Sequence, residues 1–286
     1  MSGFWLVYRR WIRDRLLSTI IWTVGIALIV VATAAFYPSL SNASGGGAGG
    51  SASGGAMSSL LGLGAGIDPT APLGYLWIAL YANIYPWMMM ALGVVLGVAA
   101  IAGEEDTGAL EYLLAKPITR TTVAFARYAG MVTILAVVSI LAGLSLLACL
   151  PLFGLTDAVT TVTSTGTATT SPGATASDVF NGTFSSFAVA MGLAGVAFLL
   201  GAATGRKGAA LAGATGLGIG GYMLYTLSNM TGSLEALTWI SPWRWYVADA
   251  MLVKGLTWNV ALPFVTAVVG LFTGWWGFLR RDLRNP

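Results

Sequence analysis

The long stretch between Arg15 and Asp68 contains no charged residue. Its first part, residues 16–36, is a run of 21 mostly apolar side chains, and about 20 such residues let an α-helix cross the hydrocarbon core of a bilayer. The chain as a whole is 56% hydrophobic and only 9% charged, whereas soluble domains carry about 25% charged residues. The sequence therefore predicts an integral membrane protein.

Apolar runs of similar length recur along the chain, and they predict one all-α transmembrane domain with six transmembrane helices. Polar or glycine-rich segments separate these runs, as expected of membrane-protein loops. We expect the six helices at residues 16–36, 84–101, 128–153, 180–204, 209–228 and 260–279. The remaining segments are predicted to be a cytoplasmic amphipathic helix (1–15), an outer Gly/Ser-rich loop with an interfacial segment (37–83), a cytoplasmic loop (102–127), an outer Thr/Ser-rich loop (154–179), an outer aromatic segment (229–259) and a cytoplasmic tail (280–286).

The basic residues predict how the chain is oriented. Lys and Arg near short loops stay on the cytoplasmic side of a membrane, and only Arg244 and Lys254 fall on the opposite side of the six-helix arrangement. Both termini are therefore predicted to be cytoplasmic, in a multi-pass protein of the cytoplasmic (plasma) membrane. The basic residues flank apolar runs and form no stripe, so nucleic acid is not a predicted partner. The residues on the cytoplasmic side are Arg9, Arg10, Arg13, Arg15, Lys116, Arg120, Arg127, Arg206, Lys207, Arg280, Arg281 and Arg284.

Several kinds of chemistry are disfavoured by the residue types present. The chain has no histidine and one cysteine, Cys149, which excludes an internal disulfide and a histidine-based metal or acid–base site. No phosphate-binding loop of the G-x-x-x-x-G-K-[ST] type occurs, so any ATP used must be hydrolysed by another chain. No charged residue lies at the centre of a predicted helix, which argues against a proton relay. Coordination of Na⁺ through hydroxyl and carbonyl oxygens stays open. We predict no catalytic residue, no metal site and no cofactor in this chain.

The loop at 102–127, here called the knob, has the pattern of a short helical protrusion. Acidic residues crowd its start, where the helix dipole favours them, and Leu110, Leu113 and Leu114 share one helical face. Pro117 ends this helix, and Thr119 is a suitable N-cap for the helix that follows. A solvated helical hairpin without any partner explains this pattern equally well.

The residue pattern of this loop favours a knob that binds a partner. Glu105-x-x-Gly-x-Leu-Glu-x-Leu-Leu-x-x-Pro-Ile-x-Arg120 resembles the first cytoplasmic loop of the permeases of type-2 ABC exporters, the family of drug, antibiotic, lipid and polysaccharide exporters. The resemblance implies a coupling helix that docks into a cleft of a separate ATPase subunit, which binds ATP and Mg²⁺. The candidate coupling residues are Glu104, Glu105, Gly108, Leu110, Glu111, Leu113, Leu114, Lys116, Pro117 and Arg120.

Two further segments agree with that family. The N-terminal segment places Trp5 and Trp11 beside Arg9 and Arg10, as in an amphipathic helix in the cytoplasmic interface. A basic flank that only sets topology is the alternative. The second segment has a Ser-Pro-aromatic pattern between the fifth and sixth helices, where family members carry re-entrant helices. An interfacial belt of tryptophans is its alternative. The candidate residues of this outer segment are Trp239, Pro242, Trp243, Arg244 and Trp245.

The resemblance implies a permease subunit that works with two ABC ATPase subunits and a second permease, either another copy or a related chain, among membrane lipids. Its cargo is expected to be amphipathic or hydrophobic, since the apolar helices carry few charges. Glycines at four-residue spacing, as at Gly216 and Gly220, fit either tight packing within one subunit or a subunit interface. A stand-alone carrier or channel without an ATPase is the rival function. Weak candidates for lining a pathway, each also explained by core packing, are Trp87, Met88, Met89, Met90, Met191 and Tyr222.

Overall fold

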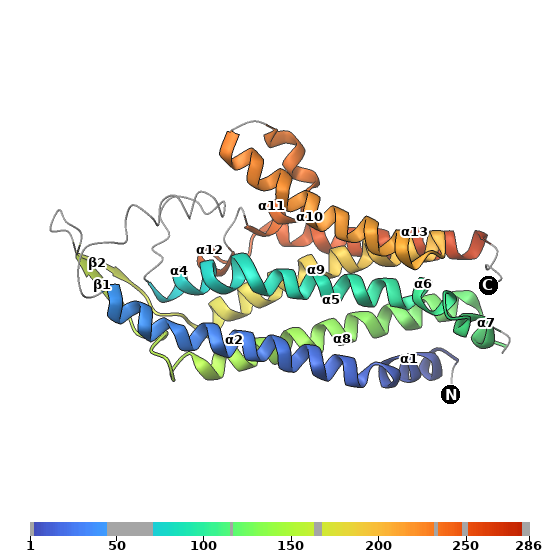
Figure 1. Cartoon of the computed structure of the whole chain (residues 1–286), viewed down its shortest axis with the longest axis horizontal. Coiled ribbons are helices and arrows are strands. Elements are labelled where there is room, and N and C mark those ends of the chain that lie inside the picture. The colour runs from blue at the N-terminus through green and yellow to red at the C-terminus, as the bar shows by residue number, and fades with distance from the viewer. Residues whose placement is uncertain are drawn as a thin grey trace.

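The computed structural model describes residues 3–44, 71–114, 117–162, 168–231, 234–247 and 251–281. These residues form an elongated bundle of long helices with a small two-stranded sheet at one end (Figure 1). In chain order the elements are α1 (Gly3–Asp14), α2 (Leu16–Ser44), α4 (Pro72–Leu76), the π-helix η1 (Trp77–Ile84), α5 (Tyr85–Ala100), α6 (Ala102–Glu105), α7 (Ala109–Leu114), α8 (Arg120–Cys149), β1 (Val159–Val162), β2 (Ala168–Ser171), α9 (Ala176–Thr204), α10 (Lys207–Thr231), the 3₁₀ helix η2 (Glu235–Ile240), α11 (Pro242–Val247), α12 (Met251–Lys254), the 3₁₀ helix η3 (Trp258–Val260) and α13 (Ala261–Arg280).

Five helical runs among the described residues are long and apolar enough to cross a membrane, which supports a multi-pass, all-α membrane protein. They are Leu16–Ser39, Pro72–Ala100, Arg120–Cys149, Ala176–Thr204 and Trp258–Arg280. The predicted helix at 209–228 is present within α10, which packs against α9 and α5. Six glycines dilute the apolar character of α10, and it is not among those five runs. The count of six crossings stays a prediction.

The second predicted crossing, 84–101, lies within a longer helical run that begins at Pro72. Pro86 lies inside this run, where a proline normally interrupts a helix because it lacks an N–H group and its ring clashes with the carbonyl four residues earlier. The chain instead widens into η1 just before the proline, and the N–H of Tyr85 donates to the carbonyl of Leu80, five residues back. The wider turn accommodates the proline without ending the helix.

The other predicted loops also contain regular structure. Helix α2 continues to Ser44 with Pro38 inside it, beyond the predicted end at residue 36. Within 154–179, β1 and β2 pair antiparallel with Val159 opposite Ser171, so the fold is not wholly α-helical. Runs of Thr and Val favour strands because their β-branched side chains are stiff.

Helix α9 lies at the centre of the bundle, packed against α5, α8, α10 and α13. Small residues allow these close approaches. A Cβ atom added at Gly97 on α5 would lie 2.5 Å from the carbonyl oxygen of Ala194 on α9. One added at Gly195 would lie 2.6 Å from the Cα of Ala267 on α13. In contrast, a Cβ atom at Gly216 would meet open space. Close packing therefore uses glycines other than the pair at Gly216 and Gly220.

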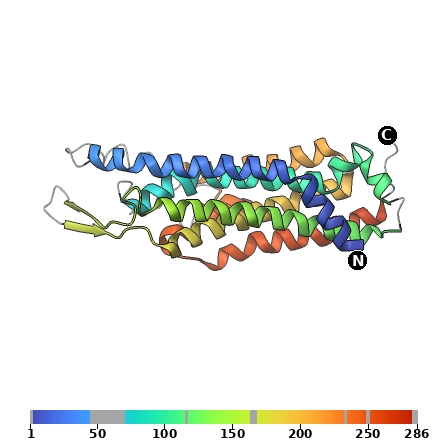
Figure 2. The same ribbon diagram turned by 90° about the horizontal axis from the view of Figure 1, so that it is seen from below.

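The two ends of the bundle differ in character. Figure 1 shows α1, α6, α7 and the end of α13 at one end, and β1, β2, α4 and α12 at the other. In Figure 2, α1 turns away from the direction of α2 and crosses the end of the bundle. The predicted cytoplasmic basic residues that the structure describes lie on elements of the α1 end. Lys116 and Arg284 lie outside the described residues, and the assignment of this end to the cytoplasm stays a prediction.

Gly97→Ala is expected to destabilise the bundle by about 1–3 kcal/mol, because the added methyl group overpacks a backbone contact. Gly216→Ala serves as the matched control, since it adds the same methyl group to an open helix face, where Ala favours a helix over Gly by about 0.5–1 kcal/mol. Thermal unfolding of both variants in the same detergent measures the difference. Equal melting temperatures would contradict the close approach of α5 and α9.

Candidate functional site

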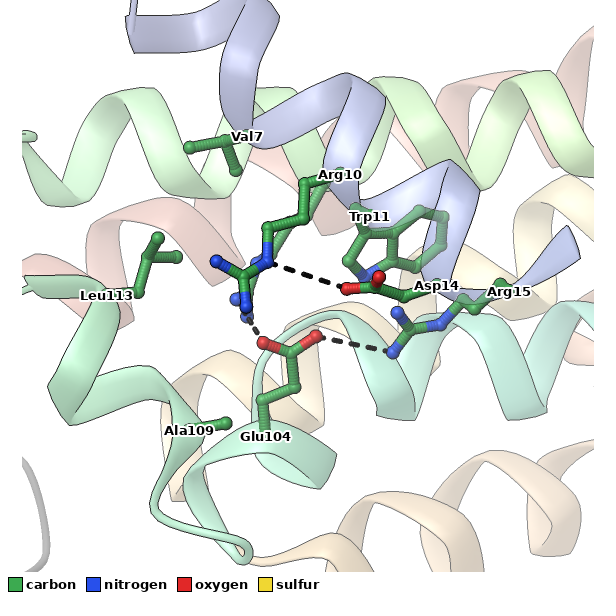
Figure 3. Close-up of a pocket in the computed structure, with 9 residues that line it drawn as sticks. Val7, Arg10, Trp11, Asp14, Arg15, Glu104, Ala109 and Leu113 are labelled. Atoms are coloured by element: carbon green, nitrogen blue, oxygen red, sulfur yellow. Dashed lines mark hydrogen bonds and ion pairs between the residues drawn. The ribbon is translucent and has the colours of Figure 1, made fainter.

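Two neighbouring glutamates on the four-residue helix α6 (Ala102–Glu105) reach different parts of the bundle. The carboxylate of Glu104 pairs with Arg15 at 3.4 Å through one oxygen and with Arg127 through the other. Arg15 stands between α1 and α2, and Arg127 lies on α8. Figure 3 shows the ion pair between Glu104 and Arg15 as a dashed line. Glu104 therefore joins three segments of the chain.

Arg15 and Arg127 also cap the C-terminal end of α5. The last carbonyls of an α-helix have no partner within the helix. Arg15 donates to the carbonyl of Ala99 at 3.1 Å, and Arg127 donates to that of Ala100 at 2.8 Å. Burial lowers the pKa of Arg15, and the opposite charge of Glu104 counteracts this effect. Cations at a helix C-terminus also complement the helix dipole. The junction of α5 and α6 is thus held by charge as well as by hydrogen bonds.

Glu105 forms a second, deeper ion pair with Arg281, just after α13. Arg281 donates to both carboxylate oxygens of Glu105, in one case at 2.6 Å, and also to the carbonyl of Ala202 at 2.7 Å. Arg120 donates to the carbonyls of Arg281 and Phe278 at 2.7 and 3.1 Å. The start of α8, the end of α9 and the end of α13 therefore meet at Glu105.

Among the acidic run and the predicted coupling residues, some contact the rest of the chain and others are exposed. Glu104, Glu105 and Arg120 contact other parts of their own chain. The neighbouring Asp106 is exposed and forms no ion pair with any described residue. Pro117 is also exposed. Asp106 and Pro117 therefore lie on the exposed surface of the knob. Sequence reasoning missed Asp106, although it stands in the same acidic run.

The knob contains two short helices, α6 and α7, where the sequence predicted one. Gly108, with φ of +71°, makes the turn between α6 and α7, a conformation that glycine adopts without strain. Leu110 is fully buried and Leu113 is half-buried. Thr119 is confirmed as an N-cap, because its side chain accepts a hydrogen bond from the N–H of Thr122. The side chains of Glu111 and Leu114, and all of Lys116, lie outside the described parts of the structure.

Helix α1 packs one face against α8. Trp11 is only 2% exposed, and a Cβ atom at Gly130 on α8 would lie 2.6 Å from its ring. Trp5 is 45% exposed, and Arg9 and Arg10 are also exposed. A cavity of about 310 Å³ separates α1 from α6 and α7.

The outer aromatic segment is fixed to the bundle by Tyr246, a residue that sequence reasoning did not select. Within η1 the carbonyl of Tyr81 would bond to the N–H five residues on, but that position is Pro86, which has none. The buried hydroxyl of Tyr246 donates to this carbonyl at 2.6 Å. It also lies 2.8 Å from the hydroxyl of Ser186 on α9. The hydrogen-bond donor that Pro86 lacks is therefore supplied by a side chain from α11.

Predicted lining residues and predicted outer residues meet in one aromatic cluster. The rings of Trp87, Tyr222 and Trp243 lie 4.6 to 5.4 Å apart, centre to centre. Trp243 is buried and donates to the carbonyl of Gly218 at 3.0 Å. The other predicted positions differ in their surroundings. Met89, Met90 and Met191 are buried within this one chain, Pro242 is buried, Met88 is half-buried, Arg244 stacks on Trp239, and Trp245 donates to the carbonyl of Trp239.

Comparison with known proteins identifies the family. The sequence model of the ABC-2 family transporter proteins matches residues 5–283. The chain belongs to the ABC-2 transporter family. Membership makes it a membrane-embedded permease component of an ABC transporter. Members of this family lack an ATP-binding site and act with ABC ATPase subunits. A search of curated proteins finds no match to this permease. Within the described ranges, no group of three or more His, Cys, Asp or Glu side chains is arranged to hold a metal ion.

In this ABC-2 permease, Glu105→Gln is expected to loosen the knob and lower stability on the order of 3 kcal/mol, because a largely buried Arg281 loses its counter-charge. Asp106→Asn is the matched control, since the exposed neighbour should change stability by less than about 0.5 kcal/mol. Hydrogen exchange of residues 102–110, together with thermal unfolding, reports both effects. Equal exchange in the two variants would contradict the assigned role of Glu105.

Tyr246→Phe is expected to destabilise the outer segment by about 1–3 kcal/mol, because the buried carbonyl of Tyr81 is left without a donor. Tyr222→Phe is the control, since the Tyr222 hydroxyl makes no hydrogen bond to any described residue and its ring packing is kept. Hydrogen exchange within 242–247 should rise only in the first variant. Equal hydrogen exchange in the two variants would contradict the role of Tyr246 as the donor to the Tyr81 carbonyl.

Proposed function

We propose that this permease is the transmembrane subunit of an ATP-driven exporter and that α6 and α7 transmit motion from the ATPase. Three observations support this. The family match spans nearly the whole chain. The knob projects at the end of the bundle that carries the predicted cytoplasmic basic residues. The residue pattern of the knob resembles that of a coupling loop. The observation that carries the proposal is the set of three ion pairs at α6, which join the knob to the bundle.

A lever must be stiff where it joins the part that it moves. Glu104 is bound to Arg15 and Arg127, and Glu105 is bound to Arg281, so α6 is tied to segments from both halves of the chain. Displacement of the knob would then be passed to α8 and α13 together. Packed helices respond to such a displacement by switching between discrete arrangements. We assign Glu104 and Glu105 to force transmission and Asp106 and Pro117 to ATPase contact.

We propose that the pathway lies between two permease subunits, either two copies of this chain or this chain with a related one. Met89, Met90 and Met191 are buried within a single chain, so a route through them would require the core of one subunit to open. A route between subunits requires only that packed surfaces move. The cargo is proposed to be amphipathic or hydrophobic, such as a drug, an antibiotic or a lipid-like molecule.

The test is to co-purify the permease with its ABC ATPase after Asp106→Arg. Reversing an exposed charge at the contact should weaken association about tenfold, through like-charge repulsion and slower encounter. Asp157→Arg is the matched control, because Asp157 is also an exposed aspartate but precedes β1 at the other end of the bundle. Binding should be unchanged in the control.

Equal loss in both variants, or no loss in either, would remove the knob from the ATPase contact. A second measurement addresses the exporter itself. Liposomes that contain the permease alone should not accumulate or release cargo until the ATPase and ATP are supplied. Transport without the ATPase would replace the proposal with a stand-alone carrier or channel.

A further inference from the structure

We propose that the cavity between α1 and the knob binds the phosphate-bearing headgroup of an anionic phospholipid. The cavity measures about 310 Å³, at the lower end of the range of roughly 300–1,000 Å³ for ligand pockets. Arg10, Trp11 and Asp14 border it from α1, Glu104 from α6 and Leu113 from α7. Figure 3 shows these side chains converging from opposite sides of the space.

Two buried hydrogen-bond donors at this cavity have no acceptor among the described residues. They are the indole nitrogen of Trp11 and the Nε of Arg127, on side chains that are only 2% and 4% exposed. Figure 3 shows the nitrogen edge of the Trp11 ring turned toward the side where Asp14 and Glu104 lie. Both groups can only donate, and buried donors are almost always paired. A ligand that supplies acceptor oxygens would therefore satisfy two groups that the described residues leave unpaired.

The charges around the cavity favour an anion as that ligand. Arg10, Arg15 and Arg127 oppose Asp14 and Glu104, which leaves three positive charges against two negative ones and a surplus of one. Both oxygens of Glu104 are already engaged by arginines. A cation would face this surplus and meet donors that cannot bind it. A phosphate oxygen satisfies both requirements, because charged acceptors form the stronger hydrogen bonds with arginine.

The walls and the position of the cavity select a lipid rather than free phosphate. Val7 and Leu113 add an apolar wall, which suits the glycerol and upper acyl carbons of a lipid and offers nothing to an inorganic ion. On the outer face of α1, Trp5 and Leu6 are exposed, as expected of a helix that rests in the interface of a membrane. Arg10 and Asp14 are largely exposed at the mouth, so a headgroup can enter from the membrane surface.

A lipid in this cavity would contact α1 and the knob at the same time. Binding would therefore stabilise their mutual position, as any ligand stabilises the state that binds it. This inference goes beyond the proposed export function, since lipid binding requires neither cargo nor ATPase. The two are tested separately.

The experiment measures lipid binding to the delipidated, full-length permease in detergent by native mass spectrometry. Phosphatidylglycerol, phosphatidylcholine and inorganic phosphate are the probes. Saturable binding of phosphatidylglycerol is expected, with weaker binding of phosphatidylcholine and no competition by inorganic phosphate. Trp11→Phe keeps an aromatic, although smaller, ring and removes the donor, and should weaken binding about tenfold, as should Arg10→Gln.

Matched controls come from the same helix. Trp5→Phe and Arg9→Gln make the same chemical changes at exposed positions outside the cavity, and both should leave affinity within about twofold. The added lipid should raise the melting temperature of the unchanged chain and of both controls, but raise that of Trp11→Phe less. Equal affinity in the cavity and control variants, or no saturable binding, overturns the site. Binding of inorganic phosphate as tight as that of the lipid overturns the lipid assignment.

Discussion

The end of this permease that contains α1, α6 and α7 depends on two adjacent carboxylates. Successive residues of an α-helix point about 100° apart, so Glu104 and Glu105 leave α6 in different directions and cannot share one partner. Glu104 takes arginines from the first half of the chain, and Glu105 takes Arg281 from the last residues described. Four residues of helix therefore fix the relative position of segments from the beginning, middle and end of the sequence.

These ion pairs also satisfy the polar groups at the ends of helices. Arg127 and Arg281 each bind a carboxylate and, at the same time, a carbonyl at the end of α5 or α9. A buried pair of charges adds little stability on balance, but removing one partner leaves a charge without compensation. The arrangement therefore specifies one geometry more strongly than it adds stability. A segment that transmits motion requires that property.

The opposite end is held by a different kind of interaction. There the deciding group is a neutral hydroxyl, because Tyr246 completes a helix that Pro86 has deprived of one donor. Between the two ends, glycines let α9 approach α5 and α13 until backbone atoms touch. The helices are thus closely packed in the middle. Ion pairs hold them together at one end, and a hydrogen bond to α11 holds them at the other. Motion at the knob would reach the outer segment through these packed helices.

The sequence alone was sufficient for the properties that depend on neighbouring residues. Apolar runs located the long helices, and Thr119 was found because capping involves residues only three positions apart. The loop pattern pointed to the family that the comparison then established. Local patterns could not show that the helix continues through Pro86, because the donor for the orphaned carbonyl comes from Tyr246 in a distant segment. Nor could they show that residues 154–179 contain a paired hairpin.

The pairing of Glu105 with Arg281 was likewise decided only by the tertiary structure. These residues are 176 positions apart in the chain, and in the sequence each fits the ordinary pattern of a charged loop. The same holds for Gly97 and Gly216, which look alike in sequence although one touches a backbone and the other faces open space. Hydropathy and helix capping depend on residues that are close together in the sequence. The partner of a charge, or the neighbour of a glycine, depends on which helices come together.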